Sequence, residues 1–328
     1  MSRPSAAPGP VKPRVVVSKC LGFDRCRWNG LVIADDFVEN LKPHAEFVPV
    51  CPEVAIALGV PRDPLRVVRD KGGLRLMQPA TKKDHTRAMI GFCRRYLETL
   101  DEVDGFILKS RSPSCGTKDV RIYAGLEKQA AVEKGSGFFG GAVLRRFPAL
   151  PVEDEGRLRN FAIREHFLRR LFTIARFRGI RRQKRMRDIV QFQAENKFLL
   201  MAYNEKEFRV MGRIVANQKK KPAAEVYQDY EEHLHCALAR TPRHTTYINV
   251  LMHAMGHFAD KINKEEKKFF LGLLEKYRKG KIPLSSDLQV LLAWGARFSA
   301  DYLMNQTFFR PYPEDLLDIS DSGKGRNR

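Results

Sequence analysis

Three of the six cysteines in this chain share one sequence context: each follows a short β-branched and apolar run. They are Cys20 after residues 15–17, Cys51 after residues 47–50, and Cys115 after residues 105–108 and a polar turn. Such runs are typical of strands. In an open parallel α/β sheet the carboxyl ends of the strands line one edge, and ligands bind in the crevice outside that edge. We therefore expect the three thiols to meet in space.

Three thiols without an evident fourth partner are compatible with two kinds of metal site. A zinc site usually completes its four ligands with His or another Cys. A [4Fe–4S] cluster normally takes four Cys, so a set of three would leave one iron open to another ligand. The chain has no C-x2-C pair. The alternative is that the thiols are unreactive and pack in the core as small apolar groups, and spacing alone leaves these interpretations open.

Residues beside the thiols favour a functional site. Glu53 stands two residues after Cys51, and a carboxylate in a pocket can move protons. Ser112 and Ser114 precede Cys115, where hydroxyl and backbone N–H groups can hydrogen-bond cluster sulfurs or a substrate atom.

The elements that must position these residues alternate between strand-like and helical patterns. Residues 85–100 have helical spacing between two strand-like runs, which predicts a mainly parallel sheet covered by helices. Pro151 and the acidic residues 153–155 predict the start of a helix. A glycine-rich stretch at residues 134–141 predicts a loop. From about residue 186 onward the spacing is helical throughout, which predicts a bundle of about six helices.

The expected fold is thus an α/β N-terminal domain with a mainly parallel sheet, followed by an all-α helical-bundle C-terminal domain. The expected boundaries are a disordered leader at 1–13, the α/β domain at 14–172, a basic linker at 173–185, the helical domain at 186–318 and a disordered tail at 319–328.

Composition excludes several classes of protein. The 328 residues include 43% hydrophobic residues, which is too many for a disordered chain. No stretch approaches the roughly 18–20 uncharged apolar residues that span a bilayer. The first dozen residues lack the apolar core of a secretory signal. Six Cys are too few for a disulfide scaffold, and we expect a cytoplasmic location.

The chain is basic, with a formal net charge of +21. Between Arg169 and Arg187 there are nine basic residues and no acidic one. One interpretation is a phosphate-binding face for RNA. The other is a solvated helix and linker, because no RNA-recognition motif accompanies the charge.

The three Cys motifs resemble those of the thiouracil desulfidase family. The matching segments are Val-Ser-Lys-Cys-Leu-Gly at 17–22, Cys-Pro-Glu at 51–53 with Gly-Val-Pro-Arg at 59–62, and Lys-Ser-Arg-Ser-Pro-Ser-Cys-Gly at 109–116. The resemblance covers about residues 14–172. Residues 186–318 resemble the YbgA-type helical domain, with Asn-Lys-Phe-Leu-Leu-Met-Ala at 196–202 and Pro-Tyr-Pro at 311–313 among the cues.

The resemblance implies a [4Fe–4S] cluster held by Cys20, Cys51 and Cys115, with a fourth iron open to the sulfur of a thiolated nucleobase or related thio-compound. It implies Glu53 as the acid/base residue and Ser112 as a polar partner of substrate or cluster. Secondary candidates from the same motifs are Ser18, Ser114 and Lys109. The implied hydrolase-like reaction is non-redox: water supplies oxygen, C=S becomes C=O, and sulfide leaves.

This chain departs from many single-domain members near the first thiol. It reads Cys-Leu-Gly-Phe at 20–23, where they read Cys-Leu-Leu-Gly, and continues with Cys-Arg-Trp-Asn-Gly at 26–30. Cys26 could serve as a further ligand or as a resolving thiol, but we interpret it as a spectator. The rival hypothesis is a non-enzymatic RNA-binding or regulatory module, and a third combines the two as a desulfidase acting on thiolated RNA.

Overall fold

A parallel sheet of four strands forms the centre of the N-terminal unit in a computed structural model, which describes residues 11–127 and 130–322. The strands lie in the order β2 (Glu46–Val50), β1 (Arg14–Ser18), β6 (Gly105–Leu108) and β9 (Val152–Asp154). All neighbouring pairs are parallel. The strands expected at residues 15–17, 47–50 and 105–108 are therefore confirmed.

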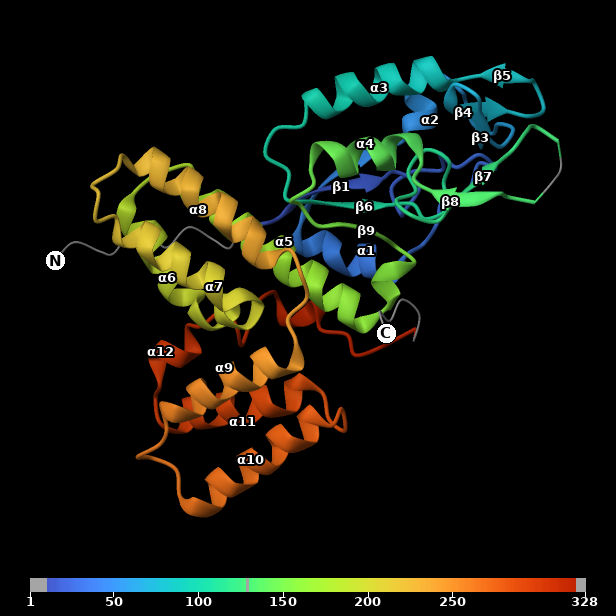
Figure 1. The fold of residues 1–328 in the computed structure, drawn as a ribbon. Helices are drawn as coiled ribbons and strands as arrows, with labels where there is room; N and C mark the ends of the chain where they lie inside the picture. Colours follow the sequence, from blue (N-terminus) through green and yellow to red (C-terminus); the bar gives the residue numbers. More distant parts are fainter. Residues whose placement is uncertain (1–10, 128–129, 323–328) are drawn as a thin grey trace. The chain divides into compact units, whose positions relative to one another are not determined.

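Helices cover both faces of this sheet (Figure 1). Helices α3 (Thr86–Glu98) and α4 (Phe138–Arg146) lie on one face, and α1 (Asp36–Leu41) and α5 (Phe161–Arg181) lie on the other. Every residue of β6 is buried, as expected for a central parallel strand covered on both sides. The helix expected at residues 85–100 is confirmed as α3.

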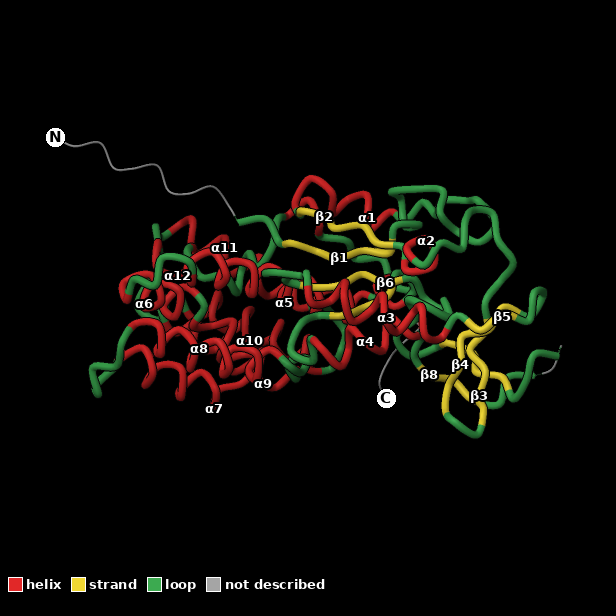
Figure 2. The backbone as a smooth tube through the Cα atoms, turned by 90° about the horizontal axis from the view of Figure 1, so that it is seen from above, coloured by secondary structure: helices red, strands yellow, loops and turns green. Residues whose placement is uncertain are grey.

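A second, mixed sheet was not expected from the sequence. Its strands lie in the order β5 (Lys83–Asp84), β4 (Gly73–Gln78), β3 (Arg66–Asp70), β7 (Val120–Tyr123) and β8 (Glu133–Gly135). Figure 2 shows it as a separate group of strands. The strands are short and charged, and none has more than two buried residues, among them Val67, Leu76 and Ile122. Because these strands contain no continuous apolar run, a search of the sequence for such runs does not detect them.

The helix expected to start at Pro151 is wrong. Residues 152–154 instead form edge strand β9, because Pro151 O accepts a hydrogen bond from Phe106 N at 2.9 Å and starts parallel pairing with β6. A short 3-10 turn at Arg157–Arg159 follows, and the helix begins only at Phe161. Residues 154 and 155 consequently stand at the carboxyl edge of the sheet.

The chain divides into a unit of Met1–Arg176 with Pro313–Arg328 and a unit of Phe177–Tyr312. Helix α5 runs through residues 173–181 of the expected basic linker, because apolar residues alternate with the arginines and are buried, such as Leu171 and Phe177. Residues 1–10 of the expected leader and 323–328 of the expected tail lie outside the described residues. Of the tail, Asp321 accepts a hydrogen bond from Asn160 at 3.1 Å.

The second unit is helical, which confirms the expected order of an α/β region and an all-α region. Its helices are α6 (Met186–Glu195), α7 (Lys197–Ala216), α8 (Ala223–Leu238), α9 (His244–Gly256), α10 (Lys264–Arg278), α11 (Leu284–Arg297) and α12 (Asp301–Met304). The ring of Phe177 stacks on that of Tyr230, with centroids 5.4 Å apart, in its aromatic core. Within the described part of the chain, no helix is long and apolar enough to cross a membrane.

The remaining short elements belong to the N-terminal unit. They are helix α2 (Pro52–Ala55) and the 3-10 turns η1 (Lys42–His44), η2 (Arg157–Arg159) and η3 (Glu314–Leu316).

Candidate active site

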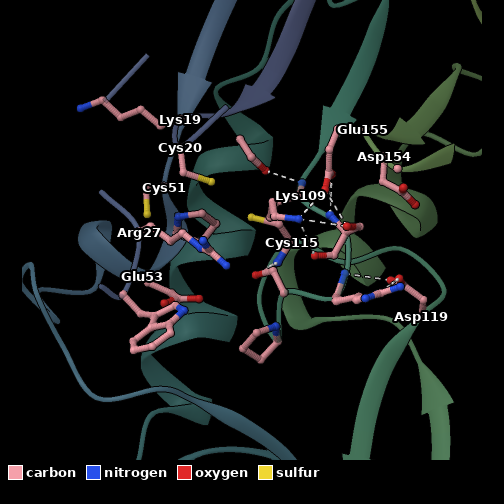
Figure 3. A pocket seen from close by; sticks show the side chains of 18 of the residues that line it. Lys19, Cys20, Arg27, Cys51, Glu53, Lys109, Cys115, Asp119, Asp154 and Glu155 are labelled. Carbon is pink, nitrogen blue, oxygen red and sulfur yellow. Dashed lines mark hydrogen bonds and ion pairs between the residues drawn. The ribbon is translucent and has the colours of Figure 1, made fainter. Parts of the chain in front are cut away.

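The three expected thiols line one pocket at the carboxyl edge of the parallel sheet (Figure 3). The pocket has a volume of about 980 Å³, and Cys20, Cys51 and Cys115 stand in its wall as free cysteines. The other expected residues Ser18, Glu53, Lys109 and Ser112 line it as well, and Ser114 contacts Glu53 directly. The structure thus brings together every site residue expected from the sequence.

Cys20 and Cys51 are positioned by the ends of two paired strands. Lys19 N donates to Val50 O at 2.8 Å, which extends the β1–β2 pairing up to both thiols. Cys51 then forms the N-cap of α2, where Pro52 occupies the first helical turn. The strand register therefore holds the two thiols side by side at the edge of the sheet.

Cys115 is positioned by a tight loop packed against the start of α4. Its N–H donates to Ser112 Oγ at 3.0 Å. Gly140 approaches the loop so closely that a Cβ there would lie 2.3 Å from Gly116 O and 2.5 Å from Cys115 O. The loop expected at residues 134–141 is therefore wrong at both ends, because residues 134 and 135 end β8 and residues 138–141 begin α4. The missing side chain of Gly140 lets the helix support the Cys115 loop.

The thiols differ in their readiness to ionise. A hydrogen bond from the Cys26 thiol lowers the pKa of Cys51 to about 7 and raises that of Cys26. Burial raises the pKa of Cys20 to about 11, and burial also raises the pKa of Cys115. In the absence of metal, Cys51 is therefore the thiol closest to its thiolate form at neutral pH. Cys26, interpreted as a spectator, lies in the pocket wall beside it.

Glu53 is held in a defined orientation despite its burial. It is 8% exposed, and Arg62 donates to its Oε2 from Nε at 2.7 Å and forms an ion pair through Nη2 at 2.6 Å. Ser114 Oγ donates to Oε1 at 2.9 Å. Arg62 also binds the carbonyl oxygens of Cys26 at 3.1 Å and Gly59 at 2.9 Å. A buried ion pair with such additional hydrogen bonds keeps the carboxylate oriented toward the pocket.

A second network forms the opposite wall of the pocket. The ammonium of Lys109 pairs with Oε1 of Glu155, and Ser110 N donates to Oε2 at 2.8 Å. Ser18 Oγ accepts from Lys109 N at 2.8 Å and, through a hydrogen bond to Cys115, counteracts the rise in the pKa of that thiol. Burial raises the pKa of the neighbouring Asp154 to about 6.

Sequence reasoning missed Arg62, Asp154 and Glu155 as pocket residues. The family motif at 59–62 predicts no role for Arg62, and the helix expected from Pro151 places the two acids in its first turn. The signal that could have found Glu155 is the one that found the cysteines: it directly follows a parallel strand.

The basic run between Arg169 and Arg187 is partly occupied by ion pairs within the chain. Arg169 is buried and pairs with Glu165 at 2.8 Å, and Arg181 pairs with Glu231 at 2.7 Å. RNA binding through this run stays a prediction.

No group of three or more His, Cys, Asp and Glu side chains in the described ranges is gathered closely enough to hold a single metal ion. A cluster in which each thiolate binds a different iron does not require such a group. Such a cluster needs separate thiolates spread around one pocket, and the three free thiols Cys20, Cys51 and Cys115 are arranged in this way.

Residues 15–155 match the 2-thiouracil desulfurase family, and residues 197–313 match a family described as a protein of unknown function, DUF1722. The uncharacterized protein YbgA of Escherichia coli is 25% identical over 172 residues, which are 52% of this chain and 95% of that protein. The uncharacterized protein YbbK of Bacillus subtilis is 30% identical over 110 residues, which are 31% of this chain and 73% of that protein. The solved structure of the [4Fe-4S]-dependent thiouracil desulfidase TudS is 28% identical, covers 45% of this chain and 93% of its own, and has a TM-score of 0.37.

Proposed function

We propose that this chain, which belongs to the 2-thiouracil desulfurase family, replaces the sulfur of a thiolated nucleobase or related thio-compound by oxygen. Family membership makes it an enzyme that cleaves a C–S bond. The observation that carries the proposal is the pocket in which three free thiols surround an oriented, buried carboxylate. The overall change is C=S plus water to C=O plus hydrogen sulfide, with no change of oxidation state.

Cys20, Cys51 and Cys115 would hold a [4Fe–4S] cluster. This assignment is supported by three observations: all three cysteines are free, they follow separate strands, and they line one pocket. When bound, such a cluster supplies a soft Lewis-acidic iron, which suits the sulfur of the substrate and makes it a better leaving group.

Glu53 would act as the base toward the attacking water. Its carboxylate accepts one proton as the water oxygen bonds to the carbon of C=S, and it returns that proton to the sulfur as the C–S bond breaks. The second water proton leaves the new hydroxyl as C=O forms, so the products are C=O, HS⁻ and one proton, which together correspond to hydrogen sulfide. Arg62 and Ser114 fix both carboxylate oxygens, so Glu53 needs little reorganisation before it acts.

Ser112 and Lys109 would assist from the sides of the pocket. The Ser112 oxygen accepts backbone N–H groups from Ser114 at 3.2 Å and Cys115 at 3.0 Å, which leaves its hydroxyl proton to donate to the substrate or a cluster sulfur. Lys109, held by Glu155 and the Ser18 contact, places a positive charge where anionic sulfide departs.

Anaerobic purification with iron and acid-labile sulfide measured per chain tests the cofactor, and conversion of 2-thiouracil to uracil tests the reaction. We expect about four irons per chain and their loss in Cys115→Ala. The matched control is Cys93→Ala, because Cys93 is a buried thiol of the same unit that lies in α3 and outside this pocket. A colourless wild-type protein without iron would overturn the cluster, and a zinc-loaded one would require a different account of the thiols.

An alternative substrate is a thiolated base within an RNA, in place of the free base. Comparing turnover of free 2-thiouracil with that of thiolated tRNA, at two salt concentrations, tests it. RNA binding through the basic run predicts faster turnover of tRNA that falls steeply with salt, and turnover of the free base alone would contradict it.

A further inference from the structure

Arg27 is a half-buried cation in the pocket wall, and its guanidinium forms no hydrogen bond or ion pair with any residue that the structure describes. Most other cations of the pocket have acidic partners. These pairs are Lys19 with Asp24, Arg62 with Glu53, Lys109 with Glu155, Arg111 with Asp119, and Arg157 with Glu153. A guanidinium withdrawn from water without a partner gains most from a ligand that accepts its hydrogen bonds.

Trp28 adds an aromatic surface at the same place. Its side chain lines the pocket and remains 43% exposed, which is a large apolar area left open to solvent. An exposed indole beside an arginine is a common arrangement for holding a planar base, because the ring stacks while the guanidinium donates hydrogen bonds.

The backbone of this segment is anchored to the catalytic side of the pocket. Arg62 N donates to Trp28 O at 2.8 Å, so the residue that holds Glu53 also fixes the position of Trp28. Gly30 N donates to Arg27 O at 2.8 Å, and Gly30 has a φ of +72° that closes the turn. Figure 3 shows Arg27 on the same side of the pocket as Cys51 and Glu53.

We propose that Arg27 and Trp28 bind the planar heterocyclic ring of the substrate, with the indole stacked on the ring and the guanidinium donating to its carbonyl and amide edge. This inference rests on the proposed function and assigns, within that same site, the residues that hold the ring of an aromatic thiolated pyrimidine. An aliphatic thioamide offers no ring to the indole and is the poorer substrate.

The test is equilibrium dialysis of labelled uracil, the expected product, against the full chain purified anaerobically. The chain has two tryptophans, and Trp294 is buried in the helical unit. A Trp294→Phe background therefore assigns any fluorescence change on binding to Trp28. The variants are Trp28→Ala, Trp28→Phe, Arg27→Met and Arg27→Lys. Lys118→Met is the charge-matched control, because Lys118 is an exposed cation at the same pocket.

We expect uracil to quench Trp28 in the parent chain. Trp28→Ala and Arg27→Met each weaken uracil binding by about ten-fold or more. Trp28→Phe retains most of the affinity, and Arg27→Lys falls between because it keeps the charge and loses the planar fork. Lys118→Met binds like the parent.

Unchanged uracil affinity in both Trp28→Ala and Arg27→Met would overturn this inference. Its failure is distinct from that of the proposed function. Normal KM for 2-thiouracil in both variants refutes the ring-binding role and leaves the desulfidation intact. Uracil binding that depends on both residues, in a chain that converts no 2-thiouracil, supports the ring-binding role and refutes the reaction.

Discussion

Ser114 donates its hydroxyl proton to Oε1 of Glu53 at 2.9 Å, across 61 residues of sequence. Ser114 is fully buried and precedes Cys115, while Glu53 follows Cys51. One hydrogen bond therefore joins the loops that carry two of the three thiols. A substitution of Glu53 therefore affects both segments, so its effect on catalysis must be measured separately from its effect on stability.

Replacing Glu53 with Gln is expected to lower kcat for desulfidation by about 100- to 10,000-fold, the usual contribution of a general base. The amide still accepts the Ser114 hydrogen bond, but the buried Arg62 loses its charge partner, so a lower thermal midpoint is also expected. Iron content per chain should stay near that of the wild type. Glu133→Gln, at an acid far more exposed than Glu53, is the control. Full turnover by Glu53→Gln would remove Glu53 from the mechanism.

Gly140→Ala is expected to destabilise the N-terminal unit by about 2 kcal/mol or more. A Cβ at this position meets backbone oxygens at 2.3 and 2.5 Å, and α4 must move away from the Cys115 loop. Iron content should fall with it. Gly272→Ala in α10 is the matched control, because a Cβ there meets nothing within 4 Å. That change should be neutral or stabilise by up to about 1 kcal/mol. Equal unfolding free energies for the two variants in urea would contradict this account of the glycine.

Asp287 is fully buried in α11, and neither carboxylate oxygen has a hydrogen-bond partner among the described residues. Burial raises its pKa to about 6 from the ordinary 3.8. A raised carboxyl pKa means that the folded chain binds the proton more tightly. Stability therefore falls as pH rises from about 4 through 6, and the full cost of roughly 2–3 kcal/mol is present above pH 6.

Asp287→Asn should accordingly unfold at higher urea concentration than the wild type at pH 8, and most of this difference should vanish near pH 4.5. Asp301→Asn, at an exposed acid of α12, should give the same small difference at both pH values. A pH-independent effect at position 287 would show that its carboxyl has a partner.

Arg164 ties the segment after residue 312 to the N-terminal unit. It is 3% exposed, and its Nη2 donates to Asp318 O at 2.5 Å and Ser320 O at 2.7 Å. Arg164→Met leaves these carbonyls without their donor, at an expected cost of about 2–3 kcal/mol. Amide hydrogen exchange over residues 315–322 should accelerate. It should stay slow in Arg121→Met, which removes an exposed arginine of β7.

The sequence by itself determined where the strands of the parallel sheet end and hence which thiols can meet. Residues 15–17 and 105–108 are apolar because their strands are buried on both faces, so each stands out as a continuous run. Residues 47–50 form an edge strand that is only partly buried, yet they are apolar throughout and stand out in the same way. Cys20 and Cys51 directly follow their strands and Cys115 follows after a turn, and the three share one edge because the strands are parallel. The helical period after residue 186 likewise identified the second region.

Only the tertiary structure decided what surrounds the thiols. Residues 151–155 carry a proline followed by acids, as is typical of a helix start. Pairing with β6 nevertheless makes residues 152–154 a strand and brings Glu155 to Lys109. Arg62 reaches Glu53 through a loop whose path no local pattern encodes. Gly140 matters because of a close approach to Cys115 O, a residue 25 positions away. The spacing of apolar residues along the sequence indicates which residues are buried. Side-chain contacts at the edge of the sheet depend instead on strand pairing and loop paths, which arise only when the chain is folded.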